Sequence, residues 1–200
     1  MTKRGRAWLW IVVLAVWAGG LLGCSGLPRI VILHDPLTPQ EHVTLGESYQ
    51  ARGLGDLATR EFEAALHREA EFVPALIGLG NLAYATNAFE ESAEFYRRAL
   101  AAVPGHPGAS NNLALVYLAS GARLDEAERL ARSAVELEGT VRPYALDTLA
   151  RIYTQQGRYR EAARALEEAA ALIPADNRGF HEQLSRSQHE LSAASSRPTN

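Results

Sequence analysis

Four segments of the chain repeat one pattern of small and aromatic residues, and this repetition constrains the fold more than any other feature. A small residue follows a leucine at Gly46, Gly80, Ala114 and Ala150, so the spacings are 34, 34 and 36 residues. One extra residue in the turn at 121–124 accounts for half of the longer gap. Since self-similarity at a fixed period indicates stacked units, we predict a repeat array.

The order of residue types within each segment is also shared. Leu-Gly, Tyr, Ala, an aromatic residue, Ala and Pro recur at fixed offsets, and this pattern resembles the tetratricopeptide repeat. The resemblance implies an all-α fold, a right-handed superhelical array of about four helix-turn-helix repeats with a C-terminal capping helix. Departures fall at Ala83, where Tyr is expected, at Ala70, where the closing Pro is missing, and at Ala131, where the second helix lacks its aromatic residue.

Each recurring position has a physical reason in such a hairpin. Small residues allow the two helices to approach closely, and Gly53, Gly121 and Gly157 supply the left-handed residue that ends the first helix. The predicted repeats within 39–174 are 39–72, 73–106, 107–142 and 143–176. The spacing of Phe180 and Leu184 predicts a capping helix over 177–192, followed by a disordered tail at 193–200.

The N-terminus has the plan of a secretory signal. Three basic residues precede an apolar stretch from Ala7 to Leu22, and small residues lead to Cys24. The ending Leu21-Leu22-Gly23-Cys24 resembles the lipobox of bacterial lipoproteins, which implies cleavage after a signal peptide at 1–23 and acylation of Cys24, with palmitate among the attached chains. Because Ser25 follows the cysteine, the resemblance favours the outer membrane, with the body in the periplasm.

An uncleaved single-pass anchor in the inner membrane is the alternative. The uncharged run from Ala7 to Leu27 is 21 residues long, which at about 1.5 Å per residue just spans a hydrocarbon core of about 30 Å. Residues 24–38 are predicted to be an extended linker, because Pro28, Pro36 and Pro39 prevent a long helix. The apolar stretch within this linker either packs on the first repeat or binds a partner.

Charge and motif content argue against several function classes. Without the three N-terminal cations, 17 basic residues face 23 acidic ones, so nucleic acid is not the expected partner. The single cysteine excludes an intrachain disulfide. His34, Asp35, Glu41 and His42 are interpreted as a polar linker and helix start rather than as a metal site. No phosphate loop or catalytic motif is found, so no enzyme, cofactor, metal or small-molecule substrate is predicted.

The resemblance implies that ligands bind in the concave groove lined by the first helix of each repeat. Asn81 and Asn112 occupy positions from which paired asparagines hold a ligand backbone in peptide-binding members, and an amide both donates and accepts. The predicted groove residues are Glu47, Gln50, Ile77, Asn81, Tyr84, Asn111, Asn112, Leu115, Asp147 and Arg151, with Gln40, Val43, Leu118, Tyr144 and Gln155 mapped beside them.

These features predict a membrane-anchored scaffold or assembly factor of the bacterial cell envelope. It is expected to bind a protein or peptide segment in the groove, because a mixed apolar and polar groove suits such a ligand. The alternative is a non-catalytic adaptor that recruits an envelope hydrolase or protease. Anchoring at the membrane would raise the local concentration of the array, so weak binding suffices in either case.

Overall fold

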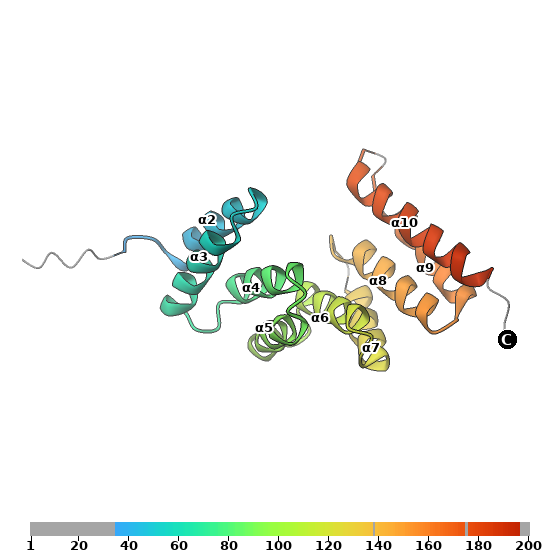
Figure 1. The fold of residues 1–200 in the computed structure, drawn as a ribbon, viewed down its shortest axis with the longest axis horizontal. Helices are drawn as coiled ribbons and strands as arrows, with labels where there is room; N and C mark the ends of the chain where they lie inside the picture. Colours follow the sequence, from blue (N-terminus) through green and yellow to red (C-terminus); the bar gives the residue numbers. More distant parts are fainter. Residues whose placement is uncertain (1–34, 138, 175, 197–200) are drawn as a thin grey trace, which may run out of the picture. The chain divides into compact units, whose positions relative to one another are not determined.

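The computed structural model describes residues 35–137, 139–174 and 176–196. The chain divides into two units, Met1–Pro36 and Leu37–Asn200, and all the described helices belong to the second. The described residues form nine helices and no strand, and consecutive helices pair into hairpins that succeed one another along the chain (Figure 1). The prediction of an all-α superhelical array is therefore confirmed. The signal peptide, Cys24 and most of the linker lie outside the described residues.

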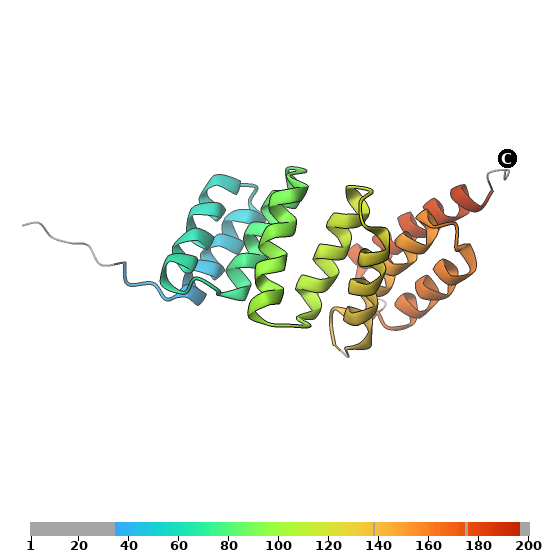
Figure 2. The same ribbon diagram turned by 90° about the horizontal axis from the view of Figure 1, so that it is seen from below.

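Eight of these helices make four hairpins, and a ninth closes the array (Figure 2). We call the first helix of each hairpin helix A and the second helix B. The hairpins are α2 (Pro39–Ala51) with α3 (Gly55–Arg68), α4 (Val73–Ala85) with α5 (Phe89–Ala102), α6 (Pro107–Ala119) with α7 (Leu124–Glu136), and α8 (Arg142–Gln155) with α9 (Tyr159–Ala171), and the closing helix is α10 (Arg178–Ser195).

All four A helices carry a proline at their first or second position, where the missing amide hydrogen costs nothing. The turn from helix A to helix B needs a left-handed residue, which is Gly53 at φ +73° in the first hairpin and Asn87 at φ +60° in the second. Asparagine tolerates this conformation better than most residues, so the second repeat dispenses with glycine there. The extra residue of the third repeat is accommodated by Arg123, which is also left-handed.

Helices A and B approach closely where a small residue faces a large one. A Cβ atom on Gly46 would lie 2.7 Å from the ring of Phe62, and one on Gly80 would lie 2.5 Å from the ring of Tyr96. In the third repeat, where helix B has Ala131 instead of an aromatic residue, helix A carries Ala114 rather than glycine. The first two repeats thus pair a glycine with a ring that fills the space beside it, as close packing requires. The third repeat has a smaller pair at the same contact, and both of its alanines are buried.

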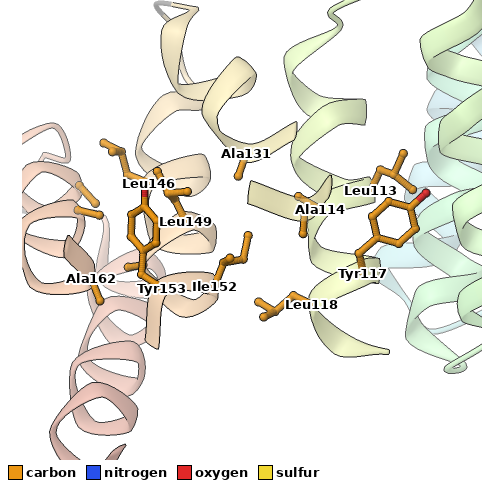
Figure 3. Close-up of a cluster of buried hydrophobic side chains, with 14 of the residues drawn as sticks. Leu113, Ala114, Tyr117, Leu118, Ala131, Leu146, Leu149, Ile152, Tyr153 and Ala162 are labelled. Carbon is orange, nitrogen blue, oxygen red and sulfur yellow. The ribbon is translucent and has the colours of Figure 1, made fainter. Parts of the chain in front are cut away.

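The apolar core runs through the array in more than one cluster. One cluster extends from α5 to α10, and its part around Tyr117, Ala131 and Tyr153 is drawn in Figure 3, where Leu118 of α6 points toward Ile152 of α8. A separate cluster around Phe62 joins the first hairpin to α4. Each repeat thus packs mainly on its neighbours, as expected of a solenoid.

Helix α10 packs against α8 and α9, and its buried face carries Phe180, Leu184 and Ser187. It continues to Ser195, three residues beyond the predicted range of 177–192. Ala193 and Ala194 favour this extension, because alanine has the highest helix propensity. Residues 197–200 of the predicted tail lie outside the described residues.

Candidate peptide-binding groove

The A helices lie side by side, with α4 contacting α2 and α6, and α6 contacting α8. We call the surface that these four helices share the A-helix groove. The predicted residues that are half-buried there, and so accessible to a ligand while held by neighbours, are Gln50, Ile77, Asn81, Tyr84, Asn112, Leu115 and Arg151, and Glu47 is exposed. Asn111 and Asp147 are buried instead.

A hydrogen-bond network links two A helices at the middle of the groove. The Nδ2 group of Asn112 on α6 donates to Oδ1 of Asn81 on α4 over 3.1 Å, and the hydroxyl of Tyr96 donates to the same oxygen over 2.7 Å. Burial raises the pKa of the Tyr96 hydroxyl to about 12, so it remains a donor at neutral pH. The structure therefore brings together the two asparagines that the repeat pattern pairs.

This network fixes both amide orientations. With Oδ1 of Asn81 occupied by two donors, Nδ2 of Asn81 and Oδ1 of Asn112 keep their hydrogen-bonding capacity within the described residues. A ligand would therefore meet one donor and one acceptor. This pair matches the carbonyl and amide groups that an extended peptide offers.

Apolar side chains flank the asparagine pair. Ile77, Tyr84 and Leu115 are half-buried, and the Tyr84 ring contacts Phe89 with centroids 5.8 Å apart. Leu118 is buried at 8% exposure in the contact between α6 and α8, so it supports the groove without lining its open surface. The apolar and polar character expected of the groove is present at its centre.

The fourth repeat departs from the prediction, because α10 covers its part of the groove. Asp147 is fully buried and accepts a hydrogen bond of 2.6 Å from Gln183 of α10, while the Tyr144 ring meets Phe180 edge-on at 4.5 Å. Arg151 lies 3.9 Å from Glu190 of α10 and does not pair with Asp147. Asp147 is therefore not an open groove residue, and Arg151 already faces a carboxylate.

Asn111 also departs from the prediction. It is only 5% exposed, and its Oδ1 has no hydrogen-bond partner among the described residues. Its equivalents in the first two repeats are Val43 and Ile77, which suit a buried position. Asn111 lies at the wall of a cavity of about 500 Å³ between α6, α8 and α10, beside Tyr144 and Gln183. The groove therefore ends in a polar recess at α10.

The polar residues considered for a metal have other roles. Glu41 closes a capping box with Thr38 at the start of α2, and His42 lies 2.8 Å from Glu61 through Nδ1. His181 lies 3.2 Å from the carbonyl of Pro174. No group of three or more potential metal ligands occurs among the described residues.

The helices also differ from membrane-spanning ones. None of the helices in the described part of the chain is both long and apolar enough to cross a bilayer.

Sequence reasoning missed a second set of residues, which joins consecutive repeats. Arg97 of α5 contacts the Tyr117 hydroxyl, and the guanidinium of Arg132 lies over the Tyr153 ring. In the sequence, these arginines and tyrosines recur at nearly the repeat period. Only the structure shows that they meet across a repeat boundary.

Comparisons with known proteins agree with this architecture. Sequence profiles described as tetratricopeptide repeat match residues 43–107 and 143–176. A protein O-mannosyl-transferase of Homo sapiens is 32% identical over 135 residues, which are 67% of this chain and 15% of that protein. The chain thus spans a small part of the length of this relative.

Solved structures share the fold. A thermophilic tetratricopeptide protein of Thermus thermophilus superposes with a TM-score of 0.67 at 21% identity, covering 79% of this chain and 84% of that chain. PilW, described as a widely conserved type IV pilus biogenesis factor, gives a TM-score of 0.65 at 16% identity over 80% of this chain and 79% of that chain. Profiles, fold and spacing agree, and this chain contains tetratricopeptide repeats, a module through which proteins bind other proteins.

Proposed function

We propose that this protein is a non-catalytic scaffold or assembly factor of the cell envelope. It is held at the membrane through Cys24, faces the periplasm from the outer membrane, and binds a segment of a protein partner in the A-helix groove. The observation that carries the binding proposal is the asparagine pair, which lies between half-buried apolar side chains. It keeps one donor and one acceptor that no other described residue occupies. Main-chain hydrogen bonds with apolar anchors on either side are how extended segments are recognised.

A photocrosslinking experiment tests the groove. p-Benzoylphenylalanine placed at Leu115, on α6, should give a discrete adduct with a protein partner on irradiation of intact cells. The same probe at Arg129, which is exposed on helix B of the third repeat, serves as the control and should give none. Equal adducts from both positions, or an adduct from Arg129 alone, would place the partner elsewhere.

The asparagine pair can be tested in the same assay. Asn112→Ala removes one donor from Asn81 while the Tyr96 hydroxyl still occupies its Oδ1, so the fold should survive and the Leu115 adduct should be lost. Asn87→Gly is a matched control, because it alters an asparagine of the α4–α5 turn and keeps the left-handed backbone. An adduct with an envelope hydrolase or protease would favour the adaptor role over the scaffold role.

The anchor needs its own experiment. Cells grown with a clickable palmitate analogue should incorporate the label into the wild-type chain and not into Cys24→Ser. A lipid anchor with several acyl chains holds a protein stably, whereas a single chain binds only marginally. An unlabelled wild-type chain that still fractionates with the inner membrane would support the single-pass alternative.

A further inference from the structure

A cleft of about 410 Å³ opens between the first and second repeats, and of the predicted groove residues only Gln50 lines it. Its walls are formed by α3 from Gly55 to Glu63, the C-terminal half of α4 and the first half of α5. Its apolar surface comes from α4 and α5, and exposed Leu54 and Leu57 lie nearby in the chain. Exposed apolar surface beside a cleft is typical of a docking site. The apolar lining residues are Leu79, Leu82, Ala83, Ala85 and Phe95.

The next boundary along the array shows what normally fills this space. Between the second and third repeats, Arg97 of α5 reaches Tyr117 of α6, and its Nε and Nη2 groups each lie 3.4 Å from the tyrosine hydroxyl. Tyr117 is only 4% exposed. An aromatic ring and a guanidinium therefore close this boundary from within the chain.

The boundary between the third and fourth repeats has the same arrangement of an arginine beside a tyrosine. The guanidinium carbon of Arg132 on α7 lies 5.7 Å from the ring centroid of Tyr153 on α8, and Tyr153 is again 4% exposed. Glu128 pairs with Arg132 over 2.9 Å and neutralises its charge. Two of the three repeat boundaries thus share an arginine from helix B and a tyrosine from the following helix A.

At the first boundary both members of the pair are replaced. Tyr49, Ala83 and Tyr117 are spaced 34 residues apart, so Ala83 holds the tyrosine position. Glu63 holds the arginine position, because Arg97 lies 34 residues after it and Arg132 lies 35 after Arg97, the extra residue being in the third turn. Ala83 and Glu63 both line the cleft. Because Ala83 has no ring, the space that a tyrosine would fill stays open. Glu63 puts a negative charge where the other boundaries have the positive charge of an arginine.

The charge of the cleft is unbalanced as well. Asp56, Glu63 and Glu91 line it, and no Lys, Arg or His of the described chain does so. None of these three carboxylates has an ion pair within the described residues. An apolar cleft bordered by unpaired carboxylates attracts a cationic group attached to an apolar one.

We propose that this cleft docks a partner segment in which an aromatic side chain stands beside an arginine. The ring would lie against Leu79, Leu82 and Ala83, and the guanidinium would pair with Glu63 and its neighbouring carboxylates. The partner thus supplies from outside the pair that the other two boundaries contain. Neither asparagine of the A-helix groove lines this cleft, so it gives the scaffold a second site.

The probe is N-acetyl-tyrosyl-arginine amide, titrated into the full-length chain in detergent micelles and followed by NMR of the methyl groups. Saturable shifts are expected at Leu79, Leu82 and Ala83. N-acetyl-tyrosyl-glutamate amide and N-acetyl-alanyl-arginine amide should bind at least tenfold more weakly, because each lacks one half of the pair. Shifts that do not saturate, or equal affinity for all three probes, would overturn the proposal.

Variants separate docking from a simple packing defect. Ala83→Tyr with Glu63→Arg rebuilds the pair of the other boundaries, so it should raise the melting temperature and weaken the probe at least tenfold. Unchanged probe affinity in this filled variant would overturn the proposal.

Glu63→Gln keeps the shape of the cleft and removes its charge, so it tests the site even if the filled variant misfolds. It should weaken the probe several-fold without changing the melting temperature. Glu167→Gln is the matched control, because Glu167 is exposed at the equivalent position of the fourth repeat, and it should leave binding unchanged. Equal effects of the two substitutions would contradict a role for Glu63.

Discussion

At the scale of single residues, complementary size governs the contact between helices A and B. Glycine faces an aromatic ring in the first two repeats, and Ala114 and Ala131 hold the equivalent positions of the third. The Tyr96 ring cannot retreat from a new side chain, because it is 2% exposed and its hydroxyl is bonded to Asn81. The same residue thus serves the hairpin contact and the groove.

Gly80→Ala should consequently destabilise the array. The added Cβ would lie 2.5 Å from the Tyr96 ring, and overpacking of this kind costs about 1–3 kcal/mol. Urea denaturation followed by circular dichroism measures the change. Gly179→Ala is the control, since nothing lies within 4 Å of its added Cβ, and it should leave the midpoint unchanged or raise it. Equal midpoints for wild type and Gly80→Ala would show that the ring moves freely.

Asn111→Leu should have the opposite effect. The substitution removes a buried amide whose Oδ1 lacks a partner among the described residues, and it restores the apolar character of Val43 and Ile77 at the equivalent positions. Replacing an unsatisfied buried polar group in this way should stabilise the protein by about 1 kcal/mol. The same denaturation assay reports the gain, and a loss of more than that amount would indicate that Asn111 has an essential structural bond.

At the scale of helices, α10 decides how much of the groove is open. Phe180→Ala should loosen this helix, because its ring packs against Tyr144 and is 2% exposed, and such truncations cost about 3–5 kcal/mol. Hydrogen exchange should accelerate in α10 and at Asp147 while α2–α5 keep their protection. Uniform acceleration over all helices would mean that the array unfolds as one unit.

The helices were predictable where local chemistry repeats. Gly53 and its counterparts marked the ends of the A helices, and the spacing of small residues located the hairpins. The asparagine pair was also predicted, because the resemblance places Asn81, just after Gly80, and Asn112, two residues before Ala114, where paired asparagines lie in peptide-binding members. The burial of Asp147 was not predictable, because it depends on α10, a single helix without a partner helix B, whose Gln183 donates to Asp147.

At the scale of the whole molecule, one group of charged residues connects the third repeat to the fourth. Burial disfavours the charged form of Glu128, but hydrogen bonds from Arg132, Arg158 and Gln156 outweigh it and hold the pKa of Glu128 below its ordinary value of 4.5. Hydrogen bonds from Arg158 lower the pKa of Glu161 as well. Through Arg158, these carboxylates link α7 to the start of α9.

Acid should therefore weaken the contact between the third and fourth repeats. A carboxylate whose pKa is lowered by folding stabilises the protein above its unfolded pKa, and this stability is lost as the pH falls through the folded value. Melting temperatures should be measured between about pH 6 and pH 3. They should decrease as the pH drops below about 4.5. Glu128→Gln should flatten this dependence, and an unchanged slope would assign the acid sensitivity to other groups.

The uneven boundaries between repeats also have a mechanical consequence. Two boundaries are bridged by an arginine and a tyrosine, and the first is bridged by neither. In an array whose units touch only their neighbours, each boundary resists bending by itself. The boundary without the arginine–tyrosine contact is therefore the easiest to bend. A force applied across the repeats would bend the chain between α3 and α4 first, and whatever fills that boundary would stiffen the array.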